Sequence, residues 1–200
     1  VRALPQTAHA ALTERLGAQA PAATLERLRY SDFNDVRLAL FLFATASEIT
    51  ASFLPVYARD AARPEWLSSE LSAAAPLGVY LIAVAILSPF GGAIALRYGA
   101  RRVFMASVVP VALALAVMAR AESLVTIMLC RGLIGLFYAI ATIACQEYSM
   151  RARRAGEATQ SASAFVGMIF GGAFCGSVLG GVIGGRFGFP AALYFGAIMA

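Results

Sequence analysis

From about residue 36 onward, the chain alternates long apolar runs with short polar segments. An apolar helix of about 20 residues crosses the hydrocarbon core of a bilayer, which is about 30 Å thick. Five runs come close to that length, so the pattern predicts five membrane helices, over residues 38–57, 73–95, 103–119, 124–145 and 162–185. A sixth run, over residues 189–200, is shorter, and we expect it to be a truncated sixth helix.

The composition indicates the same class of protein. Apolar residues make up 60% of the chain and charged residues 14%, whereas soluble domains average about 45–50% and about 25%. We therefore predict an all-α membrane protein, built as a polytopic transmembrane helix bundle. Residues 1–35 are polar and lack the apolar core of a secretory signal. We interpret them as a cytoplasmic N-terminal segment or linker before a membrane domain over residues 36–200.

The arginines set the expected orientation of the helices. The predicted loops after the second and fourth helices carry three arginines each, and those after the first, third and fifth carry two, one and one. Because basic residues concentrate in cytoplasmic loops, the even-numbered helices should end in the cytoplasm, with the N-terminus on the same side. This distribution also accounts for the net charge of +5. We therefore expect membrane lipid around the helices and no nucleic-acid partner.

Two ionisable residues lie well inside the predicted spans. Glu48 lies about 15 Å from the start of the first helix, and Arg131 about 10 Å from the start of the fourth. Charged side chains are costly at that depth, so their presence indicates a function, such as proton exchange for Glu48 or substrate contact for Arg131. The alternative is structural: an ion pair between the two, or a carboxyl hydrogen-bonded between helices.

Each ionisable residue shares one face of its helix with residues at helical spacing, and that face is more polar than the rest of the helix. We expect them to line a water-accessible cavity, although helix packing also uses such residues. They are Phe41, Thr45 and Ser52 on the first helix and Gly135, Tyr138 and Thr142 on the fourth.

The sequence carries no pattern of an enzyme or a metal site. His9 is the only histidine, and the three cysteines fall inside apolar runs without a C-x-x-C pair. No P-loop, zinc-ligand set or Ser/His/Asp set is present. We therefore expect no metal, no cofactor and no enzymatic activity.

A basic turn, Gly92-Ala-Ile-Ala-Leu-Arg-Tyr-Gly-Ala-Arg-Arg-Val103, joins the predicted second and third helices. It resembles the loop between the second and third helices of major facilitator superfamily transporters, Gly-x-Leu-Ala-Asp-Arg-x-Gly-Arg-Arg. Leu96 stands where the family usually has an aspartate. The residues that carry the resemblance include Gly92, Arg97, Gly99, Arg101 and Arg102.

Two further segments resemble the same superfamily. Arg131-Gly-Leu-Ile-Gly135 resembles its fourth-helix pattern, Arg-x-x-x-Gly, and this implies a role for the arginine in substrate or proton coupling. In the predicted fifth helix, glycines at every fourth residue indicate close packing against another helix. The same segment resembles the fifth-helix motif of superfamily exporters, Gly-x8-Gly-Pro-x2-Gly-Gly, with serine in place of proline. The residues of these two patterns are Gly167, Gly172, Gly176, Ser177, Gly180 and Gly181.

By this resemblance, we expect the N-terminal six-helix half of a twelve-helix transporter, with five complete helices and the start of a sixth. The resemblance implies a secondary active transporter of small molecules that works by alternating access. The fifth-helix motif favours efflux. We expect this efflux to be coupled to protons, with Glu48 as proton carrier and Arg131 as its partner or a substrate contact, and to take place across a bacterial inner membrane. The expected partners are a small-molecule substrate, H⁺ and the second six-helix half.

Two alternatives remain open. The chain could be the C-terminal half of a transporter, with residues 1–35 as the central loop. It could also be a transporter-like membrane sensor attached to a signalling domain, without net transport.

Overall fold

The computed structural model describes residues 37–65, 67–151 and 158–200 of the chain. The chain divides into two units, Val1–Val36 and Arg37–Ala200, and all described residues belong to the second. Within them, regular structure is helical, apart from an isolated bridge between Ala62 and Ser123. The predicted all-α helix bundle is therefore confirmed. The predicted N-terminal segment, residues 1–35, lies outside the described residues.

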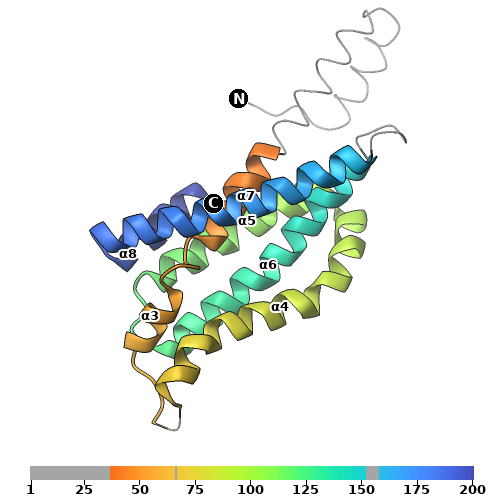
Figure 1. Cartoon of the computed structure of the whole chain (residues 1–200). Helices are drawn as coiled ribbons and strands as arrows, with labels where there is room; N and C mark the ends of the chain where they lie inside the picture. Colours follow the sequence, from red (N-terminus) through yellow and green to blue (C-terminus); the bar gives the residue numbers. More distant parts are fainter. Residues whose placement is uncertain (1–36, 66, 152–157) are drawn as a thin grey trace, which may run out of the picture. The chain divides into compact units, whose positions relative to one another are not determined.

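The helices in Figure 1 follow the apolar runs of the sequence. A helix over residues 37–48 comes first. The helices after it are α3 (Leu54–Asp60), α4 (Ser69–Tyr98), α5 (Ala100–Met118), α6 (Leu124–Arg151), α7 (Ala158–Phe187) and α8 (Phe189–Met199). Of the helices described, α4, α5, α6 and α7 contain segments long and apolar enough to cross a membrane.

The first apolar run differs from the prediction of one helix over residues 38–57. Residues 49–53 form turns that separate the helix over 37–48 from α3. The N–H of Ala51 donates to the carbonyl of Glu48, three residues back, at 3.0 Å. A continuous α-helix would instead use the carbonyl of Ser47, four residues back. The break therefore releases the Ser47 carbonyl from the helical pattern.

Pro55 gives a local reason for this break. Proline has no N–H, its ring clashes with the carbonyl four residues earlier, and it disfavours helical geometry in the residue before it. It is tolerated in the first turn of a helix, which is where α3 holds it. Pro76, Pro89 and Pro110 nevertheless lie inside α4 and α5 without ending them. Proline alone therefore does not decide whether a helix breaks, and contacts from other helices contribute.

Single glycines connect two pairs of successive helices. Gly99, between α4 and α5, and Gly188, between α7 and α8, both have φ of 87°. Residues with a Cβ rarely adopt this backbone conformation, so such short connections require glycine. The predicted connection between the helices over 73–95 and 103–119 is thus a one-residue turn at Gly99, flanked directly by helix on each side.

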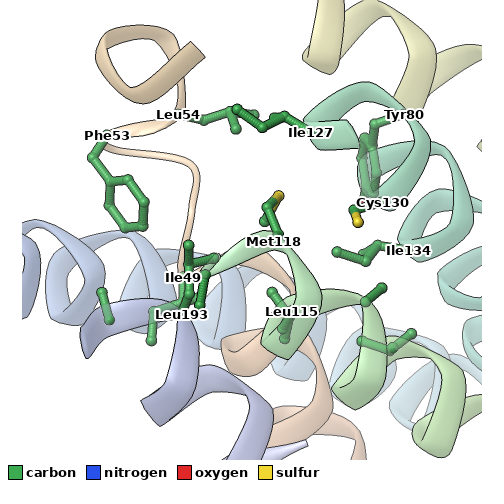
Figure 2. Packing of buried hydrophobic residues seen from close by; sticks show 14 of the residues in the cluster. Ile49, Phe53, Leu54, Tyr80, Leu115, Met118, Ile127, Cys130, Ile134 and Leu193 are labelled. Atoms are coloured by element: carbon green, nitrogen blue, oxygen red, sulfur yellow. The ribbon is translucent and has the colours of Figure 1, made fainter. Parts of the chain in front are cut away.

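The hydrophobic core joins the break to three of the other helices. Figure 2 shows Leu115 and Met118 of α5 among Ile49 from the break, Ile134 of α6 and Leu193 of α8. All five side chains are fully buried. Because Ile49 is part of this core, packing fixes the position of the turns over residues 49–53.

The loops after the first and third apolar runs pair with each other. Ala62 donates its N–H to the carbonyl of Glu122 and accepts from the N–H of Leu124, both at 2.9 Å. Nearby, the hydroxyl of Tyr57 on α3 donates to the carbonyl of Met118, the last residue of α5, at 2.8 Å. The two loops therefore lie at the same end of the bundle, as helices that cross a membrane in alternating directions require.

Candidate functional site

Glu48 is the last residue of the helix over residues 37–48, immediately before the break. Its side chain is partly buried. Its Oε1 accepts a hydrogen bond from the hydroxyl of Tyr80 on α4 at 2.8 Å. Such a bond is charge-assisted when the carboxylate is ionised. A residue of α4 therefore holds the acidic side chain in place.

Arg131 lies on α6 and is almost completely buried, with 1% of its surface exposed. Its Nη1 donates to the carbonyl of Ser47 at 3.3 Å and to the hydroxyl of Thr50 at 2.9 Å. Both acceptors lie at the break in the first helix. A buried carbonyl without a donor costs about 1–3 kcal/mol. Arg131 thus stabilises the broken helix by pairing the carbonyl that the break releases.

Tyr80 lies between the two charged groups. Its ring centre is 4.4 Å from the Cζ of Arg131, which is the distance of a cation–π contact. Its hydroxyl donates a hydrogen bond to Oε1 of Glu48. Between Glu48 and Arg131, both of which the structure describes, there is no direct ion pair, in contrast to the structural alternative from the sequence. Nη1 of the guanidinium instead donates to the acceptors at the break, and its Cζ lies over the Tyr80 ring.

Further aromatic side chains pack against Tyr80. The ring of Tyr138 on α6 lies 6.1 Å from that of Tyr80 and stacks at 6.0 Å on Phe43. Phe43 in turn contacts the edge of Phe104 on α5 at 5.5 Å. Apolar rings exclude water, so the charge of Glu48 interacts more strongly with its neighbours than it would in solvent.

The other residues expected to line a cavity from the first helix have different surroundings. The hydroxyl of Thr45 is buried and donates to the carbonyl of Phe41, one turn earlier, at 2.8 Å. Phe41 itself is partly exposed. Ser52 is exposed and lies in the turns over residues 49–53. The break therefore removes Ser52 from the helical face that it was expected to share with Glu48.

On α6, Gly135 allows α4 to approach closely. A Cβ at this position would lie 2.6 Å from the carbonyl oxygen of Tyr80. Gly135 is one helical turn from Arg131, so this close contact places Tyr80 beside the guanidinium. The hydroxyl of Thr142 donates to the carbonyl of Tyr138 at 2.8 Å, within the same helix.

The glycines of α7 face the first helix. At Gly176 and Gly180, a Cβ would overlap the carbonyl oxygens of Thr45 and Ile49, respectively. Gly172 lies against the same helix one turn earlier. The close helix packing expected from the four-residue spacing is therefore present, and its partner is the segment that carries Glu48.

The remaining residues of the exporter-like motif are less enclosed. Gly167 has no atom within 4 Å of the position of a Cβ, and at Gly181 the nearest is the hydroxyl oxygen of Ser52, at 3.4 Å. Ser177 is partly buried.

The residues of the loop motif lie at the junction of α4 and α5. Arg97, Arg101 and Arg102 are exposed on either side of Gly99. Gly92 lies within α4, with no atom within 4 Å of the position of a Cβ. The junction of α4 and α5 is therefore strongly basic.

Sequence reasoning missed Tyr80 and Thr50. Both lie in apolar runs, where a tyrosine or a threonine is indistinguishable from a packing residue. One signal was available for Tyr80, because a hydroxyl inside a long apolar run requires a hydrogen-bond partner.

The family model described as Major Facilitator Superfamily matches residues 36–200, which include Glu48, Tyr80 and Arg131. No curated protein matches the chain. In the part of the chain that the structure describes, no group of three His, Cys, Asp or Glu side chains is placed to hold a metal ion.

Proposed function

The chain belongs to the major facilitator superfamily of multi-pass membrane transporters, and we propose that it exports small molecules by alternating access, coupled to protons. Glu48 is the proposed proton carrier, and Arg131 is its partner. Tyr80 connects the two groups.

The observation that carries this proposal is the indirect contact between the two charged side chains. A carboxylate in a direct ion pair is held in its charged form by the neighbouring cation. Glu48 instead accepts a hydrogen bond from the neutral hydroxyl of Tyr80, and Arg131 donates one to the hydroxyl of Thr50 at the break in the first helix. Glu48 is an ionisable residue inside an apolar run, and ionisable residues inside membrane spans commonly serve in proton relays.

Other features support the direction and the orientation of the proposed transport. Efflux is favoured by the resemblance of the α7 glycine pattern to that of exporters. The proposed location is a bacterial inner membrane, and the arginine distribution favours a cytoplasmic N-terminus there. Exposed apolar side chains on α4 and α7, among them Phe90 and Phe174, would face lipid or a second six-helix half.

Substitution of Glu48 tests the proposal. Glu48→Gln keeps the size and the hydrogen-bonding oxygen of the side chain but cannot ionise. In vesicles that contain the full chain, it should abolish pH-gradient-driven movement of a panel of small fluorescent dyes, while membrane insertion stays normal. Glu70→Gln, the same change at an exposed residue in the first turn of α4, is the matched control and should transport normally.

Two results would contradict the proposal. Normal coupled transport by Glu48→Gln would remove this residue from the mechanism. Dye binding without accumulation by the unmodified protein would favour the membrane-sensor alternative.

A further inference from the structure

Tyr80 contacts both charged groups through different parts of its side chain. The hydroxyl donates to Oε1 of Glu48 at 2.8 Å. The ring centre lies 4.4 Å from the Cζ of Arg131. The side chain is itself buried, with 6% of its surface exposed. It is therefore fixed by packing, and a change at its hydroxyl acts mainly on Glu48.

We propose that Tyr80 is a positioning residue for the proton site: its hydroxyl sets the pH at which Glu48 takes up a proton, and its ring keeps Arg131 from pairing directly with Glu48. This inference rests on the proposed role of Glu48 as proton carrier. The hydroxyl stabilises the ionised carboxylate through a charge-assisted bond. The ring holds the guanidinium beside the break, where Ser47 and Thr50 accept from it.

The two effects act in opposite directions on the same proton. Loss of the hydroxyl removes a donor from the carboxylate, so Glu48 should take up its proton at higher pH. Loss of the ring frees the guanidinium to approach the carboxylate, so proton uptake should move back to lower pH. Comparing a variant that lacks only the hydroxyl with one that lacks both groups therefore separates the two roles.

The other charged and titratable groups around this site are few among the described residues. Arg131 and Tyr138, both on α6, interact electrostatically with Glu48. The α7 helix presents the backbone at Gly176 to the backbone of Glu48. Tyr138 resembles Tyr80 in chemistry and lies beside it, with ring centres 6.1 Å apart, but it makes no hydrogen bond to Glu48. Tyr138→Phe is therefore a matched control for removal of a hydroxyl from the same aromatic cluster.

Infrared difference spectroscopy of the purified full chain tests this proposal without any substrate. The carbonyl band of protonated Glu48 is recorded against pH and is assigned by its absence in Glu48→Gln. In Tyr80→Phe, we expect the band to appear about one pH unit higher than in the unmodified protein, a tenfold change in proton affinity. In Tyr80→Leu, it should appear at lower pH than in Tyr80→Phe. In Tyr138→Phe, which removes a hydroxyl that makes no hydrogen bond to Glu48, the band should shift less than in Tyr80→Phe.

Each outcome decides one part of the proposal. An unshifted band in Tyr80→Phe would overturn the role of the hydroxyl, and equal titrations in Tyr80→Phe and Tyr80→Leu would overturn that of the ring. If Tyr138→Phe shifted the band as much as Tyr80→Phe, the shift would not be specific to Tyr80, and this result would also contradict the role of the hydroxyl. If Tyr80→Phe does not reach the membrane, a ring-fluorinated tyrosine at position 80 keeps the shape and strengthens the donor, and it should move the band to lower pH.

Failure of this inference differs from failure of the proposed function. Suppose that Glu48→Gln abolishes coupled transport while the Glu48 band in Tyr80→Phe appears at the same pH as in the unmodified protein. Glu48 is then supported as the proton carrier, and the proposed role of Tyr80 is wrong. If Glu48→Gln transports normally, the proposed function falls, whatever the spectra of the Tyr80 variants.

Discussion

The contact between α7 and the first helix gives a quantitative prediction about Gly180. An added Cβ at Gly180 would overlap the carbonyl oxygen of Ile49 and lie 2.8 Å from its carbonyl carbon. Ordinary carbon contacts are about 3.5–4.0 Å, so the two helices would have to separate by at least about 1 Å. The obstructing atoms belong to the backbone and cannot rotate away. We therefore expect Gly180→Ala to cost about 3 kcal/mol, the upper end of the range for overpacking.

A second effect of this substitution has the opposite sign. Alanine is better than glycine inside a helix by about 0.5–1 kcal/mol. The net loss of stability in Gly180→Ala should therefore be about 2 kcal/mol. Gly185→Ala, in the same helix, meets no atom within 4 Å. This control should be neutral or slightly stabilised.

Equilibrium unfolding of the full chain in detergent micelles measures both free energies. The predicted result is a gap of about 2–3 kcal/mol between the two variants, with Gly180→Ala the less stable. Equal stability of the two variants would refute the close packing of α7 on the first helix.

Two further predictions concern the break and the one-residue turn. Arg131→Met leaves the Ser47 carbonyl and the Thr50 hydroxyl without their donor, so unfolding should require about 1–3 kcal/mol less; unchanged stability would mean that Arg131 does not support the break. Gly99→Ala places a Cβ on a residue with φ of 87° and should lose about 1–3 kcal/mol in the same assay. Gly92→Ala, inside α4 and also without close neighbours, is its control and should lose nothing, and equal effects at both positions would exclude backbone strain as the cause.

The sequence predicts four of the described helices, α4 to α7, well because their length and apolar character reflect the thickness of a bilayer. The helix over residues 37–48 and α4 to α8 all lie on runs that the hydrophobic pattern identifies. The extent of the basic loop was predicted less well. The apolar pattern ends before the helix does, and only the backbone conformation of Gly99 marks where the chain turns.

The break in the first helix was not predictable from the local pattern. Pro55 favours a break, but Pro89 lies inside an unbroken α4. The difference lies in tertiary contacts. Arg131 donates to the carbonyl of Ser47, which the break releases, and Gly180 on α7 admits the carbonyl of Ile49. Such contacts join residues far apart in the sequence, so they cannot be recognised from hydrophobic periodicity or from a local motif.

The candidate site was predictable only in part, because it too depends on contacts between residues far apart in the sequence. Glu48 and Arg131 are recognisable because isolated charges in apolar runs are costly. Their connection through Tyr80 is not recognisable, because it depends on the close approach of α4 and α6 at Gly135. The sequence therefore identifies the two ionisable groups, and the structure adds the tyrosine between them.

The central claim is that Glu48 exchanges a proton during transport, and reversing the gradients tests it most directly. Vesicles containing the full chain, at equal pH on both sides, are given a gradient of a dye that the protein transports, and internal pH is followed with a trapped indicator. The account predicts that the dye gradient drives proton movement in the opposite direction, and that Glu48→Gln abolishes this movement. Dye transport without any change of internal pH, or an unchanged proton response in Glu48→Gln, would contradict it.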